Sequence, residues 1–174
     1  QLVSDCMKEK KVFGMIQPKI YSTGKPDVYS VGCLGEIVSF NETEDKRIIL
    51  TLSGVTRFKI KEELNTKKLY REFNVDYSDF TGDLDSKIIK TKSDDDLLKR
   101  INIFFTKINY SVELDQLKKL NFDQLLSTVC MISPFTSEEK QRLIETIKIE
   151  DKVKILDRII NNNIFDLEEN KTVQ

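Results

Sequence analysis

Two segments predict a long β-hairpin in this chain. The first is Gly32-Cys33-Leu34-Gly35-Glu36-Ile37-Val38-Ser39-Phe40, and the second, beyond a polar turn at 41–46, is Arg47-Ile48-Ile49-Leu50-Thr51-Leu52-Ser53-Gly54-Val55-Thr56-Arg57-Phe58. Glycines inside a strand mark a bend or a bulge, so Gly32 and Gly35 predict a sheet that curls toward a barrel within the strand at 29–40. The second strand, at 47–60, is expected to be interrupted at Ser53-Gly54.

Three further elements complete the N-terminal part of the chain. Apolar residues at helical spacing predict a helix at 1–10, and an apolar run predicts a buried strand at 12–17. A polar loop follows at 18–28, and a short helix or loop is expected at 61–68. One more strand is then predicted by the residues that alternate with polar partners, which are Leu69, Arg71, Phe73, Val75 and Tyr77.

The remainder of the chain has a helical pattern. We expect a sheet subdomain at 1–80, a polar linker at 81–93, a helical bundle at 94–165 and a polar tail at 166–174. Four signals predict the helices: a cap at Ser93 before Asp94-Asp95-Asp96, a start at Asn121, a capping box formed by Thr136 and Glu139, and a last helix at about 150–163. Strands followed by helices indicate an α+β fold.

Composition restricts the class of protein. Lys and Arg total 28 against 29 for Asp and Glu, so the basic excess typical of nucleic-acid binding is missing. Cys6, Cys33 and Cys130 are widely spaced, which favours a reducing cytoplasm over a disulfide scaffold. No apolar run reaches the ~20 residues of a membrane span. The chain begins without Met, in what reads as a helix, so we expect an N-terminal truncation.

The residue types needed for common catalysis are missing or poorly placed. The chain has no histidine, which excludes Ser-His-Asp and Cys-His catalysis, and it has no P-loop motif. We expect no cofactor and no metal site, and interpret Asp94-Asp95-Asp96 as a solvated helix start. A Ser-Lys pair needs no histidine; its local candidates lack an activating environment, and they are Ser127, Ser133, Ser137 and Lys140.

Four residues are candidates for a peptide-binding surface. Tyr77 and Phe80 lie at the corner between the last strand and the linker, and Met131 and Phe135 lie near a helix–helix loop. Such side chains could line a groove for an extended peptide. Packing between the two subdomains is the commoner role for such residues, and it is the interpretation that we favour.

An ordered set of segments resembles the N-terminal substrate-binding domain of the Lon protease family (the ATP-dependent protease La domain). The set comprises Phe13-Gly14-Met15-Ile16-Gln17-Pro18, Val31-Gly32-Cys33-Leu34-Gly35-Glu36-Ile37, Leu52-Ser53-Gly54-Val55-Thr56-Arg57-Phe58, Tyr70-Arg71, Val75-Asp76-Tyr77 and Pro134-Phe135. The resemblance spans about Leu2 to Phe165. It implies a PUA-like, partly closed β-barrel followed by a helical bundle, and a bacterial protein of the standalone kind, without ATPase and protease modules.

This resemblance also implies a function. The domain binds and does not cut, so we expect a non-catalytic module for unfolded polypeptide or a protein partner. The alternatives are a peptidase-associated activity and RNA binding through the barrel, against which the neutral charge argues. The family's first apolar strand is absent from this sequence, and an unpaired sheet edge in its place would favour a homodimer.

Overall fold

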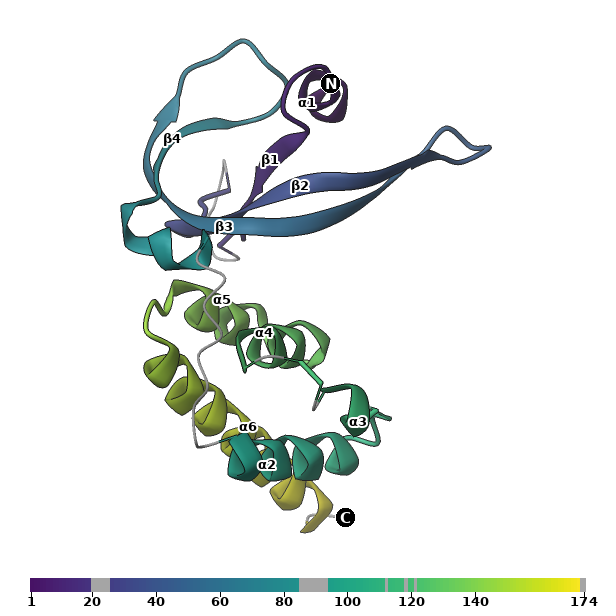
Figure 1. The fold of residues 1–174 in the computed structure, drawn as a ribbon, viewed down its shortest axis with the longest axis vertical. Helices are drawn as coiled ribbons and strands as arrows, with labels where there is room; N and C mark the ends of the chain where they lie inside the picture. Colours follow the sequence, from purple (N-terminus) through teal and green to yellow (C-terminus); the bar gives the residue numbers. More distant parts are fainter. Residues whose placement is uncertain (20–25, 85–93, 112, 118, 121, 173–174) are drawn as a thin grey trace. The chain divides into compact units, whose positions relative to one another are not determined.

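The computed structural model describes residues 1–19, 26–84, 94–111, 113–117, 119–120 and 122–172. The chain divides into two compact units (Figure 1), which we call the sheet unit, Gln1–Ser86, and the helical unit, Lys87–Gln174. Along the described chain one short helix is followed by the strands and then by the remaining helices, so the predicted mixture of sheet and helix is confirmed.

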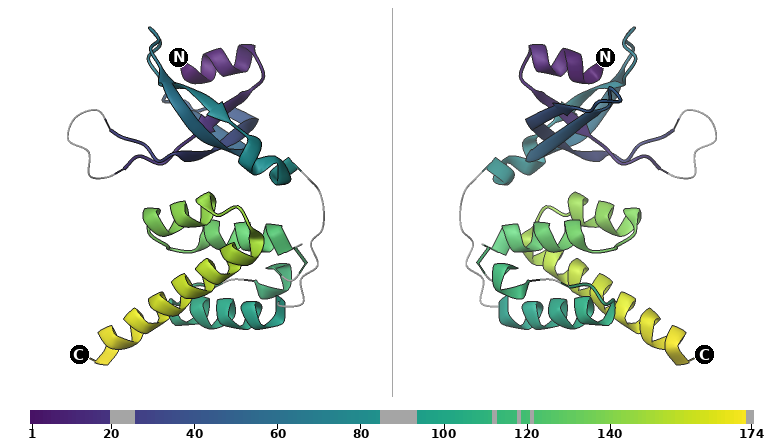
Figure 2. Two further views of the ribbon diagram at one scale, coloured as in Figure 1. Left: turned by 90° about the vertical axis from the view of Figure 1, so that its left-hand side faces the viewer. Right: turned by 90° about the vertical axis from the view of Figure 1, so that its right-hand side faces the viewer.

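The described residues of the sheet unit form one helix, four strands and a 3₁₀ turn. In chain order these are α1 (Leu2–Lys8), β1 (Val12–Met15), β2 (Val31–Glu42), β3 (Ile48–Leu64), β4 (Glu72–Asp76) and η1 (Ser78–Leu84). The strands pair antiparallel in the order β1-β2-β3-β4 and twist strongly (Figure 2). Within the described residues β1 and β4 are the two edges and do not pair with each other, so the sheet is open and the barrel is not closed.

The long hairpin of β2 and β3 contains the irregularity that its glycines predict. Leu34 pairs with Thr56 and Gly35 pairs with Gly54, so Val55 lies unpaired between them as a bulge. The strand itself continues past the bulge to Leu64. The helix or loop predicted at 61–68 is therefore wrong for its first four residues, because pairing with β4 holds this charged segment extended in spite of its weak strand propensity.

Gly32 serves close packing. A Cβ atom at Gly32 would lie 2.6 Å from the carbonyl oxygen of Met15 and 2.7 Å from the ring of Phe58. A Cβ at Gly14, on the neighbouring strand, would lie 3.0 Å from the same ring. Both glycines therefore let the far end of the Phe58 ring approach the backbone of β1 and β2 closely.

In the described part of the helical unit the chain forms five helices. They are α2 (Asp94–Lys107), α3 (Leu114–Leu117), α4 (Phe122–Ile132), α5 (Ser137–Glu145) and α6 (Ile149–Thr172). Their apolar stripes meet in one core that includes Leu97, Phe104, Leu126 and Leu156. Figure 1 shows α2 beside α6, and an ion pair between Arg100 and Asp157 links these two helices.

The helix ends agree in part with the sequence. The capping box is confirmed: Thr136 Oγ1 accepts from the backbone N–H of Glu139, whose carboxylate accepts from the backbone N–H of Thr136. The last helix continues to Thr172, beyond the predicted end near 163, since its final residues contain no Gly or Pro to end it. Ser93, Asn121 and the linker residues 85–93 lie outside the described residues.

No helix in the described part of the chain is both long and apolar enough to cross a bilayer.

Candidate functional site

A cleft of about 460 Å³ lies between α1 and one face of the sheet, and we call it the sheet cleft. It draws side chains from α1 and from all four strands. Its apolar lining consists of Leu2, Cys6, Val12, Phe13, Ile16, Leu34, Phe58, Leu64, Phe73, Val75 and Tyr77. The cleft is therefore a mainly apolar hollow built by residues from both ends of the sheet unit.

Phe58 is the most deeply buried side chain of this lining. It keeps 5% of its surface exposed, and Tyr77 meets its ring edge-on at a centroid distance of 6.5 Å. Most of the other apolar side chains in the lining, such as Phe73 and Val75, remain half-exposed. The seven residues of α1 cover only part of this face, so the sheet keeps apolar surface in contact with solvent.

Two contacts fix α1 against the segment that precedes β4. The Tyr70 hydroxyl donates to the Asp5 carboxylate at 3.0 Å, and the backbone N–H of Leu69 donates to the Gln1 side-chain oxygen at 3.0 Å. They join residues more than sixty positions apart in the chain. The wall of the cleft opposite β1 is thus held by polar contacts that no local pattern in the sequence reveals.

The charged residues in the cleft lining are balanced. Three are acidic, Asp5, Glu9 and Glu72, and three are basic, Lys10, Lys68 and Arg71. Lys68 pairs with Glu72 at 2.6 Å, and this hydrogen bond raises the pKa of the Lys68 ammonium. The cleft therefore has no net charge with which to attract an acidic or a basic ligand.

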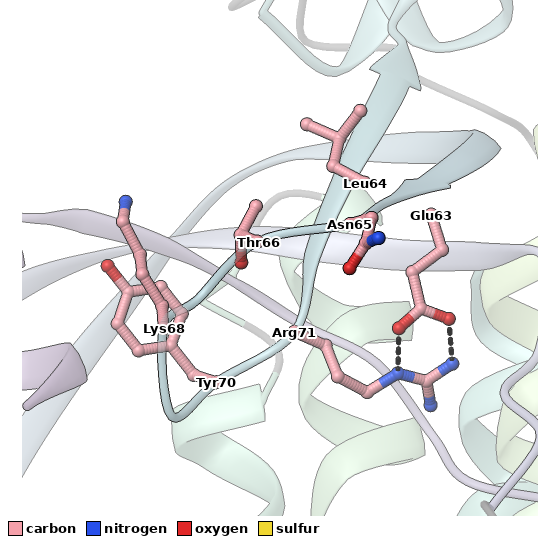
Figure 3. A pocket seen from close by; sticks show the side chains of 7 residues that line it. All are labelled: Glu63, Leu64, Asn65, Thr66, Lys68, Tyr70 and Arg71. Carbon is pink, nitrogen blue, oxygen red and sulfur yellow. Dashed lines mark hydrogen bonds and ion pairs between the residues drawn. The ribbon is translucent and has the colours of Figure 1, made fainter.

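A smaller, polar pocket of about 410 Å³ (Figure 3) adjoins the cleft and shares four lining residues with it, Leu64, Lys68, Tyr70 and Arg71. Two cations beside a cavity suggest an anion site. The Arg71 guanidinium, however, donates to both Glu63 oxygens, at 3.0 and 2.7 Å, and to the Pro26 carbonyl at 2.8 Å. Since Glu63 already neutralises this cation, the pocket lacks the uncompensated charge that would hold a phosphate.

Of the four residues predicted to bind peptide, two have exposed side chains and two have buried ones. Tyr77 is 40% exposed and lines the sheet cleft, while Phe80 is 2% exposed with the Arg57 guanidinium 4.6 Å from its ring centroid. In the helical unit Met131 is 72% exposed on α4, and Phe135 is 6% exposed with its ring 5.6 Å from that of Phe104. Only Tyr77 and Met131 thus offer substantial surface to a ligand.

Arg57 holds η1 on β3. Its guanidinium donates to both oxygens of Asp83, at 2.8 and 2.6 Å, and its backbone N–H donates to the same carboxylate at 2.9 Å. Phe80 lies within the segment that this pair fixes. Its burial therefore belongs to the attachment of η1 to the sheet.

The sequence did not identify α1 and β1 as parts of the site. Val12, Phe13 and Gly14 were assigned to a buried strand, yet they line the cleft, with Gly14 exposed. The alternation at 69–77 was a partial signal, since four of its five residues, Arg71, Phe73, Val75 and Tyr77, line the cleft. Leu69 does not, and Tyr70 and Glu72 line the cleft against the pattern, because β4 begins only at Glu72.

Three candidate catalytic side chains, Ser133, Lys140 and Cys130, lack the environment that activates a nucleophile. Ser133 is 1% exposed, and no hydrogen-bond partner of its hydroxyl occurs among the described residues. The Lys140 ammonium donates to the Met131 carbonyl at 3.3 Å. Burial raises the pKa of the Cys130 thiol to about 11, which keeps it protonated at neutral pH. A search of the described residues finds no acidic or cysteine cluster suited to a metal ion.

Comparison with known proteins identifies the family. The family model of the ATP-dependent protease La (Lon) substrate-binding domain matches residues 1–162. No curated protein sequence matches significantly. Among solved structures, a Lon N-terminal domain protein from Xanthomonas campestris superimposes with a TM-score of 0.62 at 15% identity, covering 92% of this chain and 80% of its own.

A second solved structure, the N-terminal domain of the Lon protease from Mycobacterium avium complex, has a TM-score of 0.50 at 12% identity and covers 85% of this chain and 90% of its own. At these identities the two structures show a shared fold, and the family model shows the relationship in sequence. The chain belongs to the Lon substrate-binding domain family.

Proposed function

We propose that this domain is a non-catalytic module that binds extended segments of unfolded polypeptide in the sheet cleft. The observation that carries the proposal is the lining of the cleft, where half-exposed apolar side chains from α1 and four strands surround a cavity of about 460 Å³. A cavity of this size accepts one or two apolar side chains of a peptide. The family supports the proposal, since its model describes a domain that binds the substrates of a protease.

We assign no catalytic chemistry to this domain, and we interpret its sheet as a PUA-like barrel that is open between β1 and β4 within the described residues. The absence of histidine from the whole chain supports this assignment, as does the burial of Ser133 away from solvent. A protease cleaves a peptide bond with an accessible, activated nucleophile, and the buried hydroxyl of Ser133 is not accessible.

A titration of fluorescently labelled, unfolded casein tests the proposal. We expect saturable binding by fluorescence anisotropy and a loss of about tenfold in affinity for Tyr77→Ala, because exposed aromatic side chains commonly dominate such contacts. Tyr110→Ala is the matched control, since Tyr110 is 48% exposed in the helical unit and lies outside the cleft lining. Equal affinity of the two variants would place binding elsewhere.

Cys6 provides an independent readout, because its thiol lines the cleft. Its pKa is raised, mainly by burial, so alkylation is best followed at mildly alkaline pH. Saturating casein should slow the alkylation of Cys6, measured by mass spectrometry, and leave Cys130 unaffected. If the alkylation rate of Cys6 were the same with and without casein, the result would argue against binding of casein in the cleft.

Met131 is proposed as a separate contact on the helical unit, independent of the sheet cleft, since it is the most exposed of the four predicted residues. In the same titration we expect Met131→Ala to weaken binding by a few fold, in keeping with the adaptable packing of Met side chains at binding surfaces. Phe80 would contribute indirectly by holding the backbone beside Tyr77, and Phe135 by holding the backbone beside Met131. Wild-type affinity of Met131→Ala would remove this separate contact from the proposal.

A further inference from the structure

We propose that Arg57 and Asp83, which lie outside the lining of the sheet cleft, position the Tyr77 ring for the bound polypeptide. This inference rests on the proposed function and adds two residues that act through η1 and not by contact with the ligand. Tyr77 lines the cleft, whereas Arg57 and Asp83 do not. Both are therefore positioning residues.

Two neighbouring residues of β3 act on the segment around Tyr77, one from each face of the sheet. Arg57 and Phe58 are consecutive, so their side chains point to opposite faces. On the cleft face the Phe58 ring meets the Tyr77 ring edge-on, with centroids 6.5 Å apart. On the other face the Arg57 guanidinium holds η1, which begins directly after Tyr77.

The hold of Arg57 on η1 reaches Tyr77 through the backbone. The guanidinium donates to both oxygens of Asp83, at 2.8 and 2.6 Å, and it lies 4.6 Å from the centroid of the buried Phe80 ring. The backbone N–H of Phe80 in turn donates to the Tyr77 carbonyl at 2.9 Å. One guanidinium thus fixes the far part of η1 and also the residue whose N–H holds Tyr77.

The backbone on the other side of Tyr77 is fixed by the sheet. Asp76 pairs with Lys59 in the ladder between β4 and β3, and its carboxylate accepts from the backbone N–H of Ser78 at 3.0 Å. Tyr77 therefore lies between a residue held by the ladder and a turn held by Arg57. Because the Tyr77 side chain is 40% exposed, fewer contacts restrain its ring than would restrain a buried ring, and its orientation depends on this backbone.

A restrained aromatic side chain binds better than a freely rotating one, because it loses less conformational freedom when the ligand arrives. Immobilising one side chain on binding costs a factor of about two to ten in affinity. Without the pair of Arg57 and Asp83, Tyr77 would have to be ordered by the polypeptide itself. We therefore expect loss of this pair to weaken binding by about three- to fivefold, less than the removal of the ring.

A double-mutant cycle with labelled casein tests this coupling. Arg57→Lys keeps the charge and loses the forked guanidinium, and Asp83→Asn keeps the size and loses the charge. Each should weaken binding by about three- to fivefold in wild-type protein and should have no further effect in Tyr77→Ala, because residues that act through one side chain are not additive. An equal loss in both backgrounds, or wild-type affinity of both single variants, overturns the inference. If Arg57→Lys does not fold, Asp83→Asn alone completes the cycle.

Fluorine NMR of protein labelled with meta-fluorotyrosine observes the ring without a ligand. The Tyr77 resonance is assigned by its loss in Tyr77→Phe, and it should move toward its position in unfolded protein in Arg57→Lys and Asp83→Asn. Arg47→Lys is the matched control, because Arg47 pairs with Asp45 at 2.6 Å in the turn of the long hairpin and lies outside the cleft lining. It should leave both the resonance and the casein affinity unchanged. A Tyr77 resonance that stays in place in all three variants overturns the inference.

The two readouts separate this inference from the proposed function. If Tyr77→Ala binds casein with wild-type affinity, the proposed function fails at the cleft, and the Tyr77 resonance still decides whether Arg57 and Asp83 position the ring. If Tyr77→Ala weakens binding while Arg57→Lys and Asp83→Asn change neither affinity nor resonance, the proposed function stands and the inference is overturned.

Discussion

The two units of this protein bury apolar side chains to very different extents. Among the described residues of the helical unit, fourteen buried apolar side chains form one connected core. Among the described residues of the sheet unit only Val31, Ile37, Phe58 and Phe80 are buried apolar residues. Five helices cover one another from several directions, whereas the open sheet has two faces and one short helix to cover them. The helical unit is therefore built for stability, and the sheet unit keeps apolar surface for a ligand.

Truncating the helical core should have the largest effect on stability. Phe104 has no exposed surface and packs against the rings of Phe105 and Phe135. We expect Phe104→Ala to lower the free energy of unfolding by ~3–5 kcal/mol, and Phe73→Ala in the half-exposed cleft lining to lower it by only about 1 kcal/mol. Urea unfolding followed by circular dichroism measures both. Similar losses of unfolding free energy in the two variants would contradict the difference in burial between the two units.

A glycine pair probes the tightest packing in the sheet unit. Gly32→Ala should destabilise the protein by ~1–3 kcal/mol, since the new Cβ would collide with the Met15 carbonyl and the Phe58 ring. At Gly35 the nearest atom would be Leu52 Cβ at 3.6 Å, an ordinary contact. Gly35→Ala should therefore change stability by less than about 1 kcal/mol. Thermal unfolding of the two variants in parallel gives the comparison, which fails if both are equally stable.

The capping box should contribute a moderate amount to the helical unit. Thr136→Ala removes the acceptor for the Glu139 N–H and should lower the free energy of unfolding by ~1 kcal/mol. Thr136→Ser keeps a hydroxyl in the same place and serves as the control. We would abandon this account of the α5 start if serine and alanine destabilised the protein equally in urea titrations.

The smallest expected effect is a pH dependence at the end of β4. The backbone N–H of Ser78, at 3.0 Å, and the Lys61 ammonium lower the pKa of Asp76 from 3.8 to about 2. Between these values the folded protein binds fewer protons than the unfolded chain, so this contribution is present above about pH 4 and is lost as the pH falls toward 2. Asp76→Asn should lack it. Melting temperatures of both proteins from pH 6 to pH 2 should converge in acid, and a constant gap would contradict this account.

Much of the local structure was predictable because its signals are local. The alternation at 69–77 predicted β4 and most of the residues that this segment contributes to the cleft, and the spacing of Thr136 and Glu139 identified the start of α5. The prediction for 61–64 was wrong, because pairing with β4 holds these residues extended. The predicted end of the last helix fell short, since polarity alone does not end a helix without a breaker.

The candidate site was predictable only at Tyr77, the one residue of the predicted set that lines the cleft. Phe80 and Phe135 occupy loops or turns that resemble binding corners in sequence, yet the Arg57–Asp83 pair and the Phe104 ring enclose them. Composition also excluded histidine-dependent chemistry without any structure.

The spacing of apolar side chains along the chain decided which segments are helix and which are strand. The amino-acid sequence contains that information directly. Tertiary structure alone decided which apolar faces are covered. Gln1 and Asp5, at the start of α1, accept hydrogen bonds from Leu69 and Tyr70. These contacts hold α1 over the sheet and so form the cleft. Burial depends on contacts between residues far apart in the chain, so no local pattern distinguishes the closed helical core from the open cleft of the sheet unit.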